Sequence, residues 1–299
     1  MRSLTVFHPE IEDALRARRP VVALETTLVA HGFPPGEGAA VGRESERRVR
    51  AAGAVPATIG IVDGRLLIGL TDAELQRFDE AGAEARKVGP RDLGACLAQG
   101  ALGATTVGGT LAAMRVAGIG FMGTGGLGGV HRGFPTPADV SADLGELARA
   151  QALVVSAGVK SLLDVPATAE VLETLGVPVL GWRTDTMPLF YAAGGGPPVS
   201  ARVESAEEAA RIADAHWRLG RHTALVLGRP PDESLDVEPL IQEALAAAER
   251  EGVSGQAVTP FVLAYLHEHS GGATAAANKE LVAANAGLAA EVAVAYAAL

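Results

Sequence analysis

Short apolar runs of strand length alternate along this chain with longer segments of helical period. The apolar runs lie at 21–28, 104–107, 119–122, 152–159, 177–182 and 224–227, and segments 57–61 and 66–69 flank an Asp-Gly turn. Helical period marks 43–52, 72–84, 93–99, 111–117, 162–175 and 206–219. Continuous apolar strands separated by helices are typical of a sheet with helices packed on its faces. We therefore expect an α/β protein.

The last part of the chain breaks this alternation. From Leu235 onward the pattern is helical, at 239–251, 260–269 and 273–298. No repeat of fixed period and no long linker divides the chain, and the Gly-Pro-rich segment 194–198 is best interpreted as a surface loop. We expect a single domain over residues 1–299 with a helical C-terminal third.

Composition excludes several classes of function. The formal net charge is −10, and the arginines are interspersed with acids, so nucleic acid is not an expected partner. The single cysteine, Cys96, excludes an internal disulfide framework and a cysteine-based zinc cluster. Residues 1–20 contain no apolar signal core. The uncharged stretch 94–114 is rich in Gly and Thr and is expected to be buried core, so we predict a cytoplasmic protein without a membrane span.

Lysine is rare here, since only three of the 25 basic residues are lysines: Lys87, Lys160 and Lys279. A desolvated lysine can lose its proton and act as an amine nucleophile, which arginine cannot do. Lys160 directly follows an apolar run, at the end of a strand where open α/β sheets bind ligands. It is a candidate for catalysis, and a side chain that merely extends to water is the alternative. Lys279 is expected on a solvated helix face.

Two further segments carry polar groups to strand ends. Glu25 follows the apolar residues 21–24, where desolvation would raise its pKa and suit it to general acid catalysis. The alternative is a glutamate held by the neighbouring threonines. The segment 124–133 is rich in glycine and contains His131 and Arg132, which indicates a backbone cradle for a sugar phosphate. A dinucleotide site is disfavoured, because the glycines and prolines that follow would not form a helix.

Carboxylates and amides supply the remaining candidates. Asp139 and Asp143 would share a face if a helix starts near Pro137, and either could bind Mg²⁺ or Mn²⁺. Asp139 could instead cap that helix. Asn278 and Asn285 are seven residues apart on one predicted helical face, where two amides could bind the polar edge of a base.

Taken together, these segments resemble the pseudouridine-5′-phosphate glycosidase family over nearly the whole chain. The most specific segments are 124–133, 139–144 and 156–164, with support from 24–27, 86–88, 184–191 and 259–261. The resemblance implies a single-domain α/β/α layered sandwich, usually a homotrimer. Two departures concern packing: Ser156 stands where cysteine is expected, and Gly108-Gly109 leave the segment after Val107 without side chains.

The resemblance also implies roles for individual residues. Lys160 matches the nucleophile, Glu25 the proton donor and Asp139 the ligand of one Mn²⁺ ion. The positions matched to substrate binding are Lys87, Thr106, Val107, Thr124, His131, Ser141, Ala142 and Asp143. The implied reaction is the reversible cleavage of the bond between ribose C1′ and uracil C5, in which Lys160 holds C1′ as an imine and Glu25 protonates C5.

Two other functions remain open from the sequence. A different lyase or aldolase that forms a Schiff base would also need a lysine, but the eight strand–helix repeats of its barrel are not apparent. A non-catalytic sugar-phosphate-binding protein would keep Lys87 and the glycine loop, and would need neither Glu25 nor Lys160.

Overall fold

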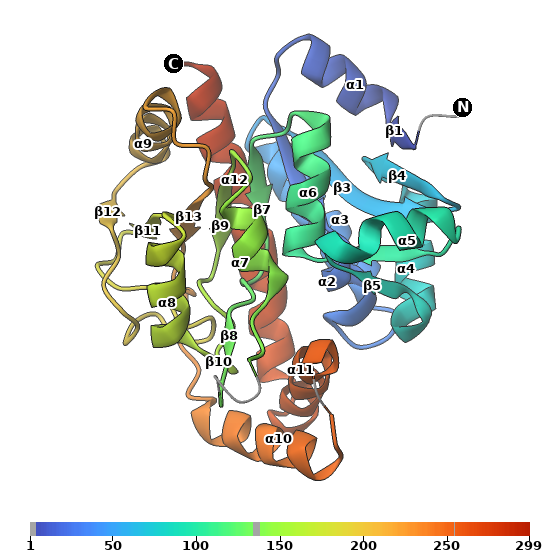
Figure 1. Cartoon of the computed structure of the whole chain (residues 1–299), viewed down its shortest axis with the longest axis vertical. Helices are drawn as coiled ribbons and strands as arrows, with labels where there is room; N and C mark the ends of the chain where they lie inside the picture. The colour runs from blue at the N-terminus through green and yellow to red at the C-terminus, as the bar shows by residue number, and fades with distance from the viewer. Residues whose placement is uncertain (1–3, 134–137, 254) are drawn as a thin grey trace.

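A mixed β-sheet runs through the centre of the molecule (Figure 1). The computed structural model describes residues 4–133, 138–253 and 255–299. Along the sheet the strands are β1 (Thr5–Phe7), β4 (Arg65–Ile68), β3 (Val55–Val62), β2 (Val21–Glu25), β7 (Phe121–Gly123), β9 (Leu153–Ser156), β13 (Leu225–Gly228), β11 (Val179–Trp182) and β12 (Ala201–Val203). At one side β6 (Gly103–Thr105) pairs with β3 and with β5 (Arg86–Val88). The β3–β4 hairpin and the β3–β6 pair are antiparallel, and the other pairs of this sheet are parallel.

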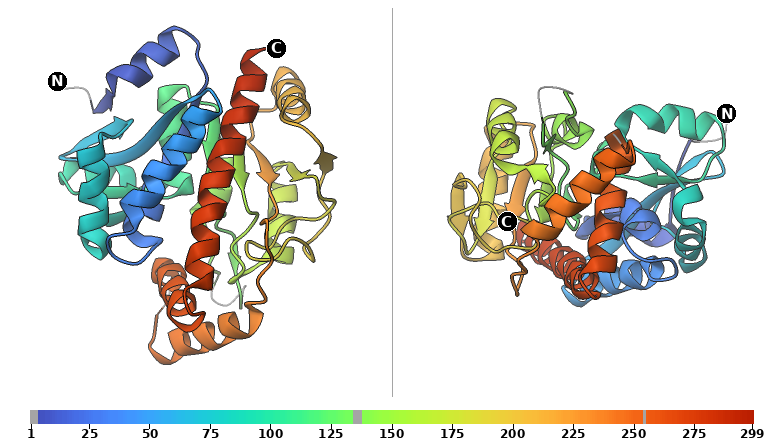
Figure 2. Two further views of the ribbon diagram at one scale, coloured as in Figure 1. Left: turned by 180° about the vertical axis from the view of Figure 1, so that it is seen from behind. Right: turned by 90° about the horizontal axis from the view of Figure 1, so that it is seen from below.

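Helices cover both faces of the sheet. Side chains alternate between the faces along each strand, so Val22 and Leu24 pack on one face while Ala23 packs on the other. The first face is covered by α3 (Gly38–Ala51), α9 (Ala206–Arg218) and α12 (Ala273–Ala297), and Figure 2 shows α3 and α12 side by side there. The opposite face is covered by α6 (Val107–Ala117), α7 (Ala142–Leu147) and α8 (Val165–Thr174). The predicted α/β/α sandwich is confirmed.

The remaining helices surround these layers. They are α1 (Pro9–Arg16), α2 (Thr27–His31), α4 (Asp72–Ala81), α5 (Leu93–Ala98), α10 (Glu238–Arg250) and α11 (Val258–His269). Figure 1 places α10 and α11 together at one end of the molecule, where the small antiparallel sheet of β8 (Val130–His131) and β10 (Leu163–Asp164) also lies. The predicted helical C-terminal third is therefore confirmed as α10, α11 and α12.

One described helix, α12, is long and apolar enough to span a membrane by length and composition. It packs against α3, α9 and strands β7, β9 and β2, and many of its side chains are buried there. Its position is that of a core helix. The uncharged stretch 94–114 is divided among α5, β6 and α6.

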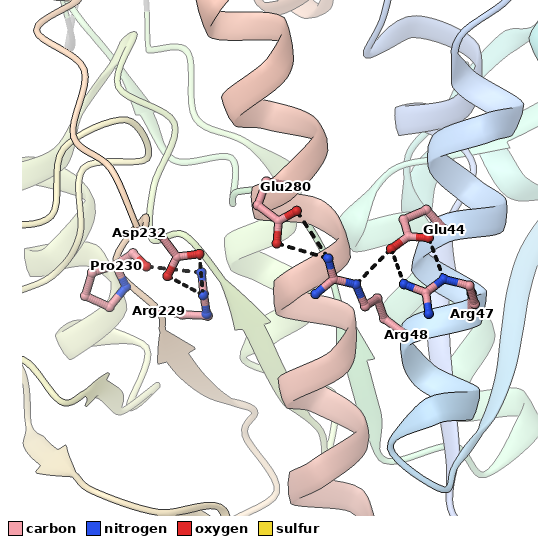
Figure 3. Close-up of polar contacts among 7 residues, drawn as sticks. All are labelled: Glu44, Arg47, Arg48, Arg229, Pro230, Asp232 and Glu280. Atoms are coloured by element: carbon pink, nitrogen blue, oxygen red, sulfur yellow. Dashed lines mark hydrogen bonds and ion pairs between the residues drawn. The ribbon is translucent and has the colours of Figure 1, made fainter.

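Ion pairs link side chains at the surface, on the packed helices α3 and α12 and in the segment after β13 (Figure 3). Glu44 on α3 accepts hydrogen bonds from Arg47 and Arg48, and Arg48 also reaches Glu280 on α12 at 3.2 Å. Arg229 pairs with both carboxylate oxygens of Asp232 at 2.7 and 3.0 Å. Exposed pairs of this kind contribute about 0–1 kcal/mol each. The α3–α12 contact therefore depends mainly on its buried apolar side chains.

Several element boundaries differ from the prediction. The segment 27–28 belongs to helix α2 rather than to the preceding strand, β5 and β12 had no predicted counterpart, and α8 begins at Val165 because residues 163–164 form β10. The helix expected at 111–117 begins at Val107, with the hydroxyl of Thr106 accepting the N–H of Gly109 at 3.1 Å. A side chain at Gly109 would overlap the backbone carbonyl of Val88, so the helix packs this closely only because glycine is present.

Two predictions placed Asp139 at the start of a helix, and both were wrong. Pro137 lies outside the described residues, and helix α7 begins at Ala142 with Ser141 as its N-cap. Asp139 therefore neither caps a helix nor shares a helical face with Asp143. The backbone around it pairs with the glycine-rich loop instead: His131 donates its N–H to the Asp139 carbonyl at 3.0 Å.

Candidate active site

Three neighbouring parallel strands bring polar groups to one edge of the sheet. Glu25 is the last residue of β2, Thr124 follows β7, and Lys160 lies just beyond β9. Beyond the sheet, the segments after β7 and β9 continue side by side, because Leu127 and Lys160 are joined by a 3.1 Å backbone hydrogen bond. The predicted meeting of these segments at the strand ends is therefore seen in the structure.

A cavity of about 290 Å³ opens at this edge. Most of the residues predicted for the site line it: Glu25, Lys87, Thr106, Val107, His131, Asp139, Ser141, Ala142, Asp143 and Lys160. They come from segments that span more than a hundred residues of sequence. Residues of α2 and α11 complete the wall.

Glu25 is buried, with 6% of its surface exposed. Desolvation raises the pKa of this carboxyl to about 7, against the opposing effects of the Lys160 charge and a hydrogen bond from Thr124. At neutral pH the carboxyl is thus present in both protonation states. A group in this condition can give a proton to a substrate and take it back. The threonines after Glu25 bond elsewhere: Thr26 donates to the Ile59 carbonyl at 2.9 Å, and Thr27 donates to the Ala104 carbonyl at 3.2 Å.

The turn that presents Lys160 is fixed by close packing. Gly158 has a φ of +82°, and a side chain there would overlap the carbonyl of Pro188. Ser156 is fully buried, and its hydroxyl accepts the Gly158 N–H at 3.3 Å. A serine thus fills the position where cysteine was expected, and supports the turn. Among the described residues, no carboxylate forms an ion pair with the Lys160 amine.

Lys87 brings a second amine to the cavity from β5. Burial and the neighbouring Lys160 charge lower the pKa of Lys87 to about 8, while Asp143 and Glu25 act in the opposite direction. A lysine with this pKa is still mostly protonated at pH 7. It can therefore meet an anionic group of a substrate.

Asp143 joins the helix α6 to the glycine-rich loop. One carboxylate oxygen accepts the Gly108 N–H at 2.8 Å, and the other accepts the Gly128 N–H at 2.9 Å. The two apolar candidates, Val107 and Ala142, are the first residues of α6 and α7. The N–H groups that follow them already have acceptors, since Gly108 donates to Asp143, Gly109 to the Thr106 hydroxyl and Asp143 to the Ser141 hydroxyl.

The glycine-rich loop provides less free backbone than a phosphate cradle would need. Its N–H groups at Leu127, Gly128 and Val130 donate to the Gly158 carbonyl, to Asp143 and to the Thr168 hydroxyl. Gly126 packs where a side chain would meet the Phe190 ring. At these positions the glycines permit close packing around the site. Residues 138–141, the next described residues after the loop, form no helix, and α7 begins at Ala142, which disfavours the dinucleotide interpretation.

Asp139 and His131 form the candidate metal position. Asp139 Oδ2 lies 3.7 Å from His131 Nδ1, and both line the cavity. Across the residues that the structure describes, no group of three or more His, Cys, Asp and Glu side chains could hold a metal ion. The donor set nevertheless fits a hydrated hard cation, which is often held by one or two carboxylates and completed by water and substrate phosphate.

Three predicted residues lie outside the cavity wall. Thr124 is fully buried and hydrogen-bonds Glu25. Asn285 is also fully buried, and its Nδ2 donates to the carbonyls of Thr124 and Gly125 at 2.8 and 3.3 Å. Asn278 is buried nearby, and neither of its polar side-chain atoms has a hydrogen-bond partner in the described part of the chain. Thr124 thus holds the Glu25 carboxyl in place, and Asn285 holds the backbone at 124–125.

Other residues of the cavity were not predicted as site residues. Arg91 follows β5, and Thr259, Pro260 and Leu263 come from α11. His31 of α2 donates from Nε2 to the Ala85 carbonyl at 2.9 Å, and burial lowers the pKa of its ring. The rarity of lysine could not reveal Arg91, because arginine is common throughout this chain. For His31, the available signal was its position at the end of a short apolar run.

An open α/β/α sheet with an amine and a buried acid at the carboxyl ends of its strands is typical of enzymes that act on small molecules. Comparison with known families makes this more specific. The chain matches the family model described as indigoidine synthase A like protein over residues 10–295, and it belongs to that family.

Curated relatives confirm the resemblance drawn from the sequence. The chain is 48% identical to the pseudouridine-5′-phosphate glycosidase of Salinispora tropica, over 99% of this chain and 94% of that protein. It is 46% identical to the enzyme of the same name from Sorangium cellulosum, over 97% and 93%. Among solved structures it superimposes on the prealnumycin C-glycosynthase AlnA in complex with ribulose 5-phosphate, with a TM-score of 0.90 and 42% identity over 100% of this chain and 98% of that one.

Proposed function

We propose that this protein is a pseudouridine-5′-phosphate glycosidase. It cleaves the bond between ribose C1′ and uracil C5 with water to give uracil and ribose 5-phosphate, and it can run in reverse. The observation that carries the proposal is the presence of Lys160 and the protonatable Glu25 in one cavity. The names of the curated relatives agree with this substrate, and so does the sugar phosphate with which AlnA forms its complex.

The bond has no leaving oxygen to protonate, so a carbon must leave. In the proposed mechanism the neutral amine of Lys160 attacks C1′ and displaces the ring oxygen, which takes up the proton that the attacking nitrogen loses. The nitrogen lone pair then forms an imine to C1′ as the bond to uracil C5 breaks, and Glu25 gives its proton to C5. Water hydrolyses the imine, which releases ribose 5-phosphate and restores the amine.

Lys87 is the proposed phosphate ligand. It lies in the same cavity as the start of α6, whose N-terminus favours an anion. Binding energy from a phosphate that does not react can hold C1′ against Lys160. Asp143 contributes by accepting the N–H groups of Gly108 and Gly128, which fixes the start of α6 relative to the loop.

Asn278 is the better candidate of the two asparagines for binding the base, although its buried side chain lies outside the cavity wall. Asn285 already uses its Nδ2 on two backbone carbonyls, whereas both polar atoms of Asn278 are unpartnered within the described residues. A buried amide without partners costs free energy that a ligand would recover. Uracil offers the N–H and C=O groups that such an amide binds.

A Mn²⁺ ion is also part of the proposal. Asp139 would hold it, with His131 beside it, and the ion would supply positive charge against the substrate phosphate. We further propose that the protein acts as a homotrimer, as the resemblance implies, and that it works in the cytoplasm.

The proposed glycosidase and the two alternatives, a sugar-phosphate-binding protein and an aldolase-type lyase, differ in the products that they release. Incubating the protein with pseudouridine 5′-phosphate and Mn²⁺, and separating the products by chromatography, should give uracil and ribose 5-phosphate in equal amounts. A sugar-phosphate-binding protein would bind the nucleotide and release nothing. An aldolase-type lyase would cleave within the sugar, so that no free uracil forms, and either result would overturn the proposal.

A further inference from the structure

A cavity lined by arginines lies at the opposite end of the sheet from the active site. This cavity has a volume of about 790 Å³, against about 290 Å³ for the active site. It is bordered by the starts of β2, β7 and β9, whose other ends lead to Glu25, Thr124 and Lys160. In Figure 1 this end carries α1 and the C-terminus of α12, away from α10 and α11. Its size lies in the range of small-molecule sites.

The charge of this cavity is opposite to that of the chain. Four arginines line it, namely Arg18, Arg19, Arg115 and Arg149, together with His222. No aspartate or glutamate is among the described lining residues, although the chain has a net charge of −10. Glu146 is not among the lining residues, and it forms ion pairs with Arg115 at 3.5 Å and with Arg149 at 3.3 Å.

Arg18 and Arg19 are left without such a partner. Within the described residues neither guanidinium forms a hydrogen bond or an ion pair, and Glu10, the acid whose pKa Arg19 helps to lower, is already bound by Arg50 at 2.5 and 2.8 Å. Arg18 also has a φ of +53°, which glycine would adopt without strain and which costs other residues about 1–2 kcal/mol. Two free guanidiniums at the rim suit a phosphate or carboxylate group.

An aromatic cluster forms the adjoining wall. Trp217 packs edge to face against Phe121 and Tyr296, which are tilted against each other, and the ring centroids are 5.3–6.1 Å apart. All three line the cavity. Trp217 is 8% exposed, and its indole N–H is buried with no acceptor in the described part of the chain. A water or a ligand group supplies the acceptor for a donor of this kind.

We propose that this cavity binds a planar aromatic anion of nucleotide size. Arg18 and Arg19 bind its phosphate, the aromatic wall packs against its ring, and the Trp217 N–H donates to an acceptor on it. The site is independent of the catalytic function proposed above. It shares β2, β7, β9 and α6 with the active site, so a ligand here is held by the same elements that position Glu25 and Lys160.

Isothermal titration calorimetry with AMP as the probe tests the proposal on the full-length protein. Wild type should bind AMP more tightly than it binds adenosine or inorganic phosphate. The variant R18Q/R19Q should bind AMP at least about tenfold more weakly, since it loses charge-assisted hydrogen bonds. Trp217→Phe should weaken binding by a smaller factor. The matched control is Arg16→Gln, because Arg16 lies on α1 outside the cavity and pairs with Glu12 at 2.6 Å.

A Lys87→Ala variant separates this site from the active site, and it should keep its AMP affinity. Absence of AMP binding, equal affinity in wild type and R18Q/R19Q, or loss of binding in Lys87→Ala alone would each overturn the proposal. A second copy of the chain is the competing occupant, because Val116 and Leu219 are exposed beside this end of the sheet. Sedimentation that shows R18Q/R19Q dissociating a wild-type oligomer would assign the cavity to an interface instead.

Discussion

Glu25 has two properties that a proton donor at neutral pH requires. It is buried at the end of a strand, and the resulting desolvation raises its pKa to about 7. The hydrogen bond from Thr124 and the backbone ties of Asn285 hold this arrangement. The protonation state of one residue therefore connects the stability of the fold to its chemistry.

That connection predicts a specific dependence of stability on pH. Folding favours the protonated carboxyl, so its contribution is fully present below about pH 4.5 and is lost as the pH rises through about 7. Glu25→Gln should remove this loss and should be more stable than wild type at pH 8, by at most about 3 kcal/mol. The same substitution should abolish uracil release. Urea unfolding at pH 5 and pH 8 measures the first effect, with the exposed Glu12→Gln as control. Parallel pH profiles for wild type and Glu25→Gln would contradict it.

Lys87 gives a prediction about substrate preference. Pseudouridine 5′-phosphate should be cleaved with a higher kcat/KM than pseudouridine, and Lys87→Ala should reduce only the former, by about 10- to 100-fold, because one charge-assisted contact is lost. The preference should also weaken as the pH rises through about 8, where Lys87 loses its charge. Lys279→Ala is the control, since Lys279 lies on α12 and pairs with Glu37 at 2.8 Å. If both substrates react equally well in wild type, the assignment of Lys87 to the phosphate is wrong.

At the scale of elements, the close approach of α6 to β5 is the feature that shapes the site. It depends on Gly109, where a side chain would overlap the carbonyl of Val88. Gly109→Ala should destabilise the protein by about 1–3 kcal/mol, the usual cost of overpacking. Gly94→Ala is the matched control, because Gly94 lies in helix α5 with open space around it and should gain about 0.5–1 kcal/mol. Equal unfolding midpoints for the two variants would contradict this account of the Gly108-Gly109 pair.

The elements that could be predicted from the sequence are those with a strong local pattern. The apolar strands β2, β9, β11 and β13 and the helices α9 to α12 have such patterns, and so does the β3–β4 hairpin with its Asp-Gly turn. The start of α6 could not be predicted, because the propensity of Gly108-Gly109 opposes a helix and tertiary packing decides the outcome. Strands of three residues such as β5 and β12 carry too little pattern.

In the candidate site, too, residues with a local sequence pattern could be predicted, and residues whose roles depend on long-range contacts could not. Lys160 and Glu25 were found because each follows an apolar strand, and strand ends meet at one edge. The roles of Thr124 and Asn285 depend on contacts across 99 and 161 residues of sequence, which spacing cannot reveal. Asp139 was considered as a helix N-cap because aspartate and serine are equally favoured there. The residue that caps α7 is Ser141, two positions later.

At the scale of the whole molecule, segments far apart in sequence meet at the catalytic cavity, and Asp139 lies there with its carboxylate 3.7 Å from the His131 ring. We expect chelation to reduce activity strongly and Mn²⁺ to restore it, because a sparse oxygen and imidazole donor set holds a hydrated cation weakly. Asp139→Ala should resemble the chelated wild type in uracil release. Full activity of the metal-free wild type would exclude the metal from the account.

The central claim is that Lys160 forms a covalent imine with the sugar. Sodium borohydride added during turnover of pseudouridine 5′-phosphate should reduce this imine, and peptide mass spectrometry should locate one pentose phosphate adduct on Lys160. Lys160→Arg should fold, give no adduct and release no uracil, because a guanidinium keeps the charge but cannot form the imine. Lys279→Arg should behave as wild type. An adduct on Lys87 or Lys279, or continued turnover with no adduct on any lysine, would contradict the account.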